Sequence, residues 1–155
     1  MTVSELVKGG VAPLFDRLAS AQSEHVRSAA HLETMESVQD SIGRELRRLF
    51  NTRSPLSAED YAQGSGTVLE YGIPDFSVFS AQNAADLQRL AALLRTAVAR
   101  YEPRLSEVSV QVSPAPNRHE VALVRIGAQA RAGLALRRVD FEMLLGAPDS
   151  LMKVA

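Results

Sequence analysis

The pattern of apolar and polar positions predicts two amphipathic helices in the first two thirds of the chain. Apolar residues recur there at every third or fourth position, which places them on one face of a helix. The first helix is predicted within residues 21–50, and its buried face comprises Val38, Ile42, Leu46, Leu49 and Phe50. The second is predicted over residues 81–101, and its buried face comprises Leu87, Leu90, Ala91, Leu94, Val98 and Tyr101. Pro55 and Pro103 follow the two helices and end them.

The last third of the chain changes to the period of two that marks a half-buried strand. An alternating segment begins at Val108, and longer strands are predicted over residues 121–129 and 137–145. Turns are predicted at residues 113–117, which hold two prolines, and at residues 132–133. Helices followed by consecutive strands predict an α+β fold. Two main helices are expected to pack on one face of a small, largely antiparallel sheet of about three to four strands.

The remaining segments are predicted to be an arm and a loop. Residues 1–20 predict an extended N-terminal arm, because Gly9-Gly10 and Pro13 interrupt regular structure, and residues 21–155 predict a single domain. Residues 57–80 are rich in turn-forming residues and predict an ordered loop. The apolar anchors of this loop on the core are expected to be Val68, Leu69, Tyr71, Ile73 and Phe76.

The arm contains a short apolar segment between charged residues, Leu14-Phe15-Asp16-Arg17-Leu18. Its apolar side chains, Leu14, Phe15 and Leu18, have two possible uses. They either pack against the chain's own domain or dock into a groove on a partner protein. The sequence by itself leaves both possibilities open.

Composition restricts the classes of partner. With 155 residues, 46% of them apolar, the chain has the length and composition of one globular domain. A formal net charge of -1 argues against nucleic acid as a partner. No apolar run approaches the roughly 18 residues of a membrane-spanning helix, so no direct membrane insertion is expected. The chain has no cysteine, which fits a reducing compartment, and we expect a cytoplasmic protein.

Catalytic chemistry finds little support in the residue pattern. His25 and His31 would point in different directions on a helix, and His119 stands alone, so no metal or other cofactor is expected. Glycoside hydrolysis needs only two carboxylates across a cleft. The carboxylates considered for it are Asp75, Glu102, Glu120, Asp140 and Glu142. A peptidoglycan hydrolase is therefore the alternative function, although no spacing selects a pair.

The segment Glu102-Pro103-Arg104-Leu105 forms a rigid corner after the second predicted helix, because proline restricts the backbone there. The side chains of Glu102 and Arg104 can pair with each other or with groups on a partner. We expect this corner to be exposed. Reversing the charge of Arg104 would then change stability by no more than about 0.5 kcal/mol.

Four motifs occur in an order that resembles a known family. They are Leu14-Phe15-Asp16-Arg17-Leu18, Asn51-Thr52-Arg53, Tyr71-Gly72-Ile73-Pro74-Asp75 and Glu102-Pro103-Arg104-Leu105. Together they resemble the baseplate wedge family, which includes the type VI secretion subunit TssE and a phage T4 tail protein. The first motif is similar to the N-terminal motif of the secretion branch of this family. The resemblance runs from about Leu14 to Leu145.

The resemblance implies a structural, non-enzymatic subunit of a contractile baseplate. The expected wedge partners are TssF, TssG and TssK, and Leu14, Phe15 and Leu18 would dock onto them. The expected sheath partners are TssB and TssC, whose polymerisation would be seeded by strand exchange at a sheet edge. Glu102, Pro103 and Arg104 match the motif that the family uses for this sheath contact. The subunit would be cytoplasmic and recruited to a baseplate docked at the inner membrane.

Overall fold

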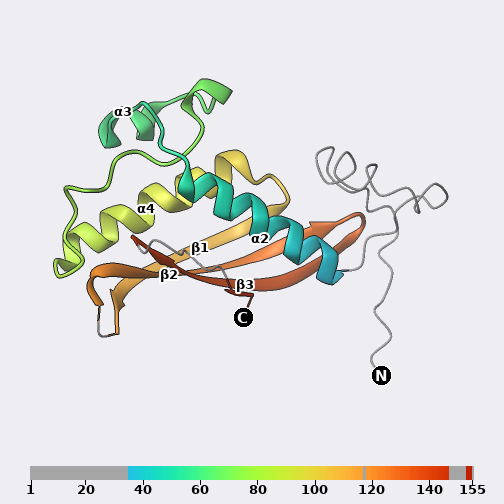
Figure 1. Ribbon diagram of the computed structural model, residues 1–155. Coiled ribbons are helices and arrows are strands. Elements are labelled where there is room, and N and C mark those ends of the chain that lie inside the picture. Colours follow the sequence, from blue (N-terminus) through green and yellow to red (C-terminus); the bar gives the residue numbers. More distant parts are fainter. Residues whose placement is uncertain (1–34, 117, 147–152, 155) are drawn as a thin grey trace, which may run out of the picture.

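The computed structural model of the chain describes residues 35–116, 118–146 and 153–154 (Figure 1). The helical part precedes the strands, as the apolar pattern predicts. Its elements are α2 (Met35–Asn51), α3 (Ala58–Gln63), a 3-10 turn at Val68–Glu70 and α4 (Ala84–Tyr101). The strands are β1 (Leu105–Ala115), β2 (Arg118–Ala132), β3 (Ala135–Leu145) and β4 (Lys153–Val154). The predicted α+β class is confirmed.

The strands form one antiparallel sheet in the order β1-β2-β3-β4, so each strand pairs with the next one along the chain. Figure 1 shows α2 and α4 on the same side of this sheet. The core lies between the helices and the sheet. The prediction of two main helices on one face of a small antiparallel sheet is therefore confirmed.

Alternation along the strands separates a buried face from an outer face. In β3, Val139, Phe141 and Met143 are buried, whereas Asp140 and Glu142 between them are only partly covered. Successive side chains of a strand point to opposite faces, so this pattern follows directly from the period of two in the sequence. The side chains of one face therefore complete the core, and those of the other form a polar surface.

The two predicted helical faces are confirmed in their central positions. All five residues assigned to the buried face of the first helix are buried in α2, while Arg44, Arg47 and Arg48 are exposed. In α4 the most buried members of the stripe are Leu90 and Leu94 together with Val98. The part of the first predicted helix that precedes Met35 lies outside the described residues, as does the N-terminal arm.

The secondary structure differs from the prediction at residues 113–115 and 58–63. Residues 113–115 were predicted as a turn, but β1 continues through Ala115 and carries Pro114 within it. A strand accommodates proline where no neighbour needs its missing N–H, which is the situation at the edge of a sheet. Residues 58–63 were predicted as loop but form α3, because Ser57 caps the helix by accepting a hydrogen bond from the backbone N–H of Asp60 at 3.1 Å.

The anchors of the segment between α2 and α4 also differ in part from the prediction. Ile73 is buried, and Tyr71 and Phe76 pack against the core, as predicted. Val68 and Leu69 are almost fully exposed on the 3-10 turn, so their prediction as anchors was wrong. An anchor that was not predicted is Tyr61 of α3, which is completely buried.

Tyr61 closes this segment through one hydrogen bond. Its hydroxyl donates to the backbone carbonyl of Gly72 at 2.7 Å, and burial raises the pKa of Tyr61 to about 12. Arg100 of α4 lies over the Tyr61 ring, 5.2 Å from its centroid, and donates to the carbonyl of Tyr61. A single aromatic residue thus ties α3, the 71–75 segment and α4 together.

Replacing Tyr61 with phenylalanine is expected to lower the free energy of unfolding by about 1–2 kcal/mol, because the buried Gly72 carbonyl loses its donor. Urea denaturation of the purified variant measures this change. Tyr101→Phe is the matched control, since its hydroxyl bond to the Thr67 carbonyl is exposed. Equal losses in the two variants would show that the buried hydrogen bond stabilises the chain no more than the exposed one.

Candidate functional site

The Glu102-Pro103-Arg104 corner forms at the point where α4 passes into β1. The backbone N–H of Glu102 donates to the carbonyl of Val98 and so makes the last helical bond of α4. Pro103 follows and cannot continue the helix because it has no N–H. The N–H of Leu105 then donates to the Glu102 carbonyl at 3.1 Å, which starts β1. Helix α4 therefore ends before Pro103, as the sequence predicts, and β1 begins two residues after it.

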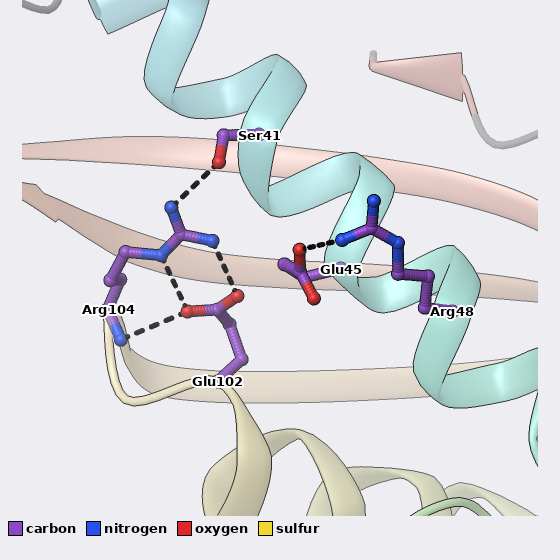
Figure 2. A network of polar contacts seen from close by, with 5 residues as sticks. All are labelled: Ser41, Glu45, Arg48, Glu102 and Arg104. Carbon is purple, nitrogen blue, oxygen red and sulfur yellow. Dashed lines mark hydrogen bonds and ion pairs between the residues drawn. The ribbon is translucent and has the colours of Figure 1, made fainter. Parts of the chain in front are cut away.

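The side chains of Glu102 and Arg104 form a two-point ion pair inside this corner (Figure 2). The guanidinium donates from Nε to Oε1 and from Nη2 to Oε2 of Glu102, both at 2.8 Å. Its third nitrogen, Nη1, donates to the hydroxyl of Ser41 on α2 at 3.0 Å. The pair therefore connects the end of α4 to the middle of α2. We call Ser41, Glu102 and Arg104 the corner network.

The corner network is mostly buried. Glu102 has a side chain that is 4% exposed, and that of Arg104 is 23% exposed. The expectation that both charges lie on an accessible corner was wrong, although Pro103 between them is exposed. The reason is that α2, a helix far away in the sequence, packs over the corner and covers the two charges.

A second arginine–glutamate pair in Figure 2 gives the contrast. Arg48 pairs with Glu45 one turn apart on α2, and the Arg48 side chain is 54% exposed. Exposed pairs of this kind contribute little, because water and salt screen them. Glu102 has lost its water to burial, so it depends on the donors that Arg104 provides. The two pairs share their chemistry and differ in burial.

The corner also fixes the start of the sheet. The carbonyl of Arg104 accepts a hydrogen bond from the N–H of Arg131 on β2 at 2.8 Å. Leu105 next to it pairs with Ala130. Beyond this point a bulge interrupts the β1–β2 register between Ser106 and Ser109, and Glu107 within it has a positive φ of 52°. The corner network therefore determines where β1 begins relative to α2 and β2.

The structure brings the other two described motifs together. Arg53 and Ile73 form an isolated parallel bridge, in which Ile73 N–H donates to the Thr52 carbonyl and Ser54 N–H to the Ile73 carbonyl, each at 2.9 Å. Arg53 also reaches Asp75 at 3.3 Å. The Asn51-Thr52-Arg53 and Tyr71–Asp75 motifs are thus two sides of one contact.

An aromatic contact links this pair of motifs to the corner. The ring of Tyr71 meets that of Tyr101 edge to face, with 5.1 Å between the centroids. Tyr101 directly precedes Glu102 in the chain. All three motifs described by the structure therefore support one another around the ends of α2 and α4, a relation that their sequence order did not reveal.

The carboxylates considered for glycoside hydrolysis are engaged in other contacts. Glu102 is held by Arg104, Glu142 lies 2.9 Å from Arg125, and Asp140 lies 3.5 Å from Arg138. Asp75 accepts hydrogen bonds from the backbone and hydroxyl of Ser77, which lower its pKa. A general acid needs the opposite shift. The Glu120 side chain lies outside the described residues.

In the described ranges, 35–116, 118–146 and 153–154, no group of three potential metal ligands occurs. None of the helices that they contain is both long and apolar enough to cross a membrane. The arm residues Leu14, Phe15 and Leu18, as well as His25 and His31, lie outside these ranges, so their predicted roles remain predictions.

Two matches among solved structures are weak. One chain of a structure described as the baseplate complex from the type VI secretion system shares 21% identity, with a TM-score of 0.48. The match covers 72% of this chain and 97% of that chain. A Geobacter sulfurreducens protein, described as a proposed tail lysozyme, shares 18% identity with a TM-score of 0.47. That match covers 76% of this chain and 99% of the other.

The chain matches a family model, whereas no curated protein matches it. The family model for baseplate wedge protein gp25 matches residues 36–133, which is more than half of the 155 residues. This range begins in α2, passes through the corner network and ends at the turn after β2. The chain belongs to the baseplate wedge protein gp25 family.

Proposed function

We propose that this chain is the TssE-type wedge subunit of a type VI secretion baseplate. Family membership supports a structural role in a baseplate. The similarity of the arm motif Leu14–Leu18 to the N-terminal motif of the secretion branch favours that branch over the phage branch. In this role the chain works in the cytoplasm and is recruited to a baseplate docked at the inner membrane. It binds the wedge proteins TssF, TssG and TssK and performs no catalysis.

The same chain would start the sheath by accepting a strand from a TssB or TssC subunit. The observation that carries this proposal is the position of β1 at the end of the sheet. Within the described residues β1 pairs with β2 on one side and with no strand on the other. An unpaired strand edge offers main-chain donors and acceptors to an incoming strand.

The usable part of this edge runs from Ser109 to Ser113. Register shifts interrupt the β1–β2 pairing between Ser106 and Ser109 on one side and after Pro114 on the other. Bulges and prolines prevent an edge from pairing indiscriminately. The incoming strand would therefore be short, and its register would be limited by these two interruptions.

The family motif would act on this edge indirectly. Glu102 and Arg104 are occupied with each other and with Ser41, and they hold the start of β1. Their contribution to sheath assembly would be to fix the edge in place, while the exposed Pro103 remains available for direct contact. This use of the motif requires a folded, intact corner network.

Cysteine cross-linking tests the strand-exchange proposal. The chain has no cysteine, so a single one at exposed Gln111 on β1 gives a unique attachment point. Directly opposite residues of paired strands lie about 5 Å apart. A short bismaleimide should therefore join Gln111→Cys to a cysteine in a terminal strand of TssB or TssC in cells that assemble sheaths.

The matched control is Gln63→Cys, at an exposed position on α3 and away from the sheet edge. We expect no sheath adduct from it. Equal adducts at both positions, or adducts of Gln111→Cys with wedge proteins alone, would exclude β1 as the sheath-binding edge. The family assignment would stand in that case, since it does not depend on this edge.

A further inference from the structure

The β2–β3 hairpin ends in an apolar tip that nothing in the described part of the chain covers. Leu134 is 91% exposed and Leu136 is 53% exposed. Arg131, Arg137 and Arg138 on the two strands are exposed as well. We call residues 131–138 the hairpin tip. Large apolar side chains surrounded by polar ones on a surface often mark an interaction site.

The conformation of the turn does not require a leucine. Ala132 and Ala135 form the last pair of the hairpin, so Gly133 and Leu134 alone make the turn. Gly133 supplies the positive φ, 58°, that a two-residue turn needs. Polar residues usually fill the other position. The Leu134 side chain thus contributes little to the fold, and its exposure has a cost in solubility.

The surroundings of the tip are basic. From Val121 to Val139 the sequence contains four arginines and no aspartate or glutamate, and Arg125, the one farthest from the tip, pairs with Glu142 at 2.9 Å. Asp140, the first carboxylate after the tip, lies 3.5 Å from Arg138. The net charge of the whole chain is only -1, so this excess of arginine is local to the hairpin. A local basic surface selects partners with complementary negative charge.

The tip is held rigidly. The β2–β3 register runs without interruption from Ala122 paired with Leu145 to Ala132 paired with Ala135. The N–H of Arg131 donates to the Arg104 carbonyl, which attaches the base of the tip to the corner network. A preorganised element loses little conformational entropy when it binds.

We propose that the hairpin tip is a docking element for a partner protein with an apolar pocket rimmed by carboxylates. Leu134 enters the pocket, and the guanidinium groups around it pair with the carboxylates in two-point contacts. Buried apolar anchors with arginines beside them dominate the affinity of many interfaces. This proposal goes beyond the strand exchange at β1 and does not depend on it.

The composition of the tip favours a protein over a lipid surface. Even one myristoyl chain gives only marginal membrane binding, and a leucine side chain is far shorter. The tip has no tryptophan, tyrosine or phenylalanine, which are the residues that anchor proteins at membrane interfaces. Arginine instead suits planar carboxylates, where lysine cannot make the same two-point contact.

A photo-cross-linker tests the proposal in the full-length chain. p-Benzoylphenylalanine replaces Leu134 in cells that express the complete secretion system, and mass spectrometry identifies the adduct. Val78 is the matched control position, because it is 80% exposed but lies in a separate loop. We expect a protein adduct from position 134 that is absent from position 78, with the attached peptide in a carboxylate-rich surface.

The partner that the adduct identifies is then purified separately, and its affinity for the chain is measured. Leu134→Gln and the double variant Arg131→Glu/Arg138→Glu should each weaken binding at least tenfold, whereas Val78→Gln should leave it unchanged. Neither set of substitutions removes a buried side chain, so circular dichroism should remain that of the wild type. An adduct with lipid, with a second copy of this chain or within the same chain would overturn the proposal. Equal adducts at positions 134 and 78, or none at 134, would overturn it as well.

Discussion

Arg104→Glu is expected to lower the free energy of unfolding by about 3 kcal/mol, because it leaves the buried Glu102 carboxylate without its donors. It also places a second negative charge beside the first and removes the bond to Ser41. The sequence-based expectation of a change near zero assumed an exposed corner. For a domain of this size the loss corresponds to a fall in melting temperature of roughly 6–12 °C.

Chemical denaturation of wild type, Arg104→Glu and Arg48→Glu measures the effect. Arg48 belongs to the exposed pair with Glu45, so its reversal should cost less than about 1 kcal/mol. Similar losses in the two variants would refute the view that the corner network is structural. If the prediction holds, failure of Arg104→Glu to assemble a sheath is explained by a damaged corner and does not identify a contact surface.

Gly72→Ala is expected to destabilise the chain by about 4 kcal/mol. A Cβ at Gly72 would lie 2.5 Å from the backbone oxygen of Thr52, and the φ of 113° is one that side chains rarely adopt. The backbone would have to move away from Thr52, which breaks the two hydrogen bonds of the Arg53–Ile73 bridge. The carbonyl that Tyr61 binds would move with it.

The control for Gly72 is Gly66→Ala. Gly66 also has a positive φ, 75°, but a Cβ there meets nothing closer than 3.5 Å, on the flexible Arg100 side chain. Its cost should be only the conformational one, about 1 kcal/mol. Thermal unfolding of both variants compares them directly. A loss for Gly72→Ala no larger than that for Gly66→Ala would mean that the backbone of the Arg53–Ile73 bridge can shift at little energetic cost.

The apolar period predicted the helices and strands well because most of the core is built from regular elements. The apolar stripe of α2 and the alternation of apolar and polar residues in β3 directly indicate which residues face the core. The short α3 was missed because turn formers surround it. Ser57 followed three residues later by Asp60 was the available signal, since this spacing is typical of a capped helix start.

The nature of the corner could not be read from the sequence. Glu102 and Arg104 are two residues apart, so their pairing was foreseeable, but the residue that completes the network is Ser41. Nothing local in the sequence indicates that α2 covers the corner, because burial depends on how distant elements pack. Pro114 was a signal that was misread. It was taken as part of a turn, whereas a proline inside a strand marks the edge of a sheet.

The order of the strands has a consequence for the course of folding. Each strand pairs with its neighbour in sequence, and the β2–β3 turn has only two residues, so the sheet can form by successive local steps with little loop closure. The bond from Arg104 to Ser41 joins positions 63 residues apart and completes only when α2 docks. Damage to the corner network should therefore accelerate unfolding and leave the refolding rate almost unchanged. We therefore expect the sheet to form early in folding. The slow unfolding of the native chain would then depend on α2, which docks over the corner last.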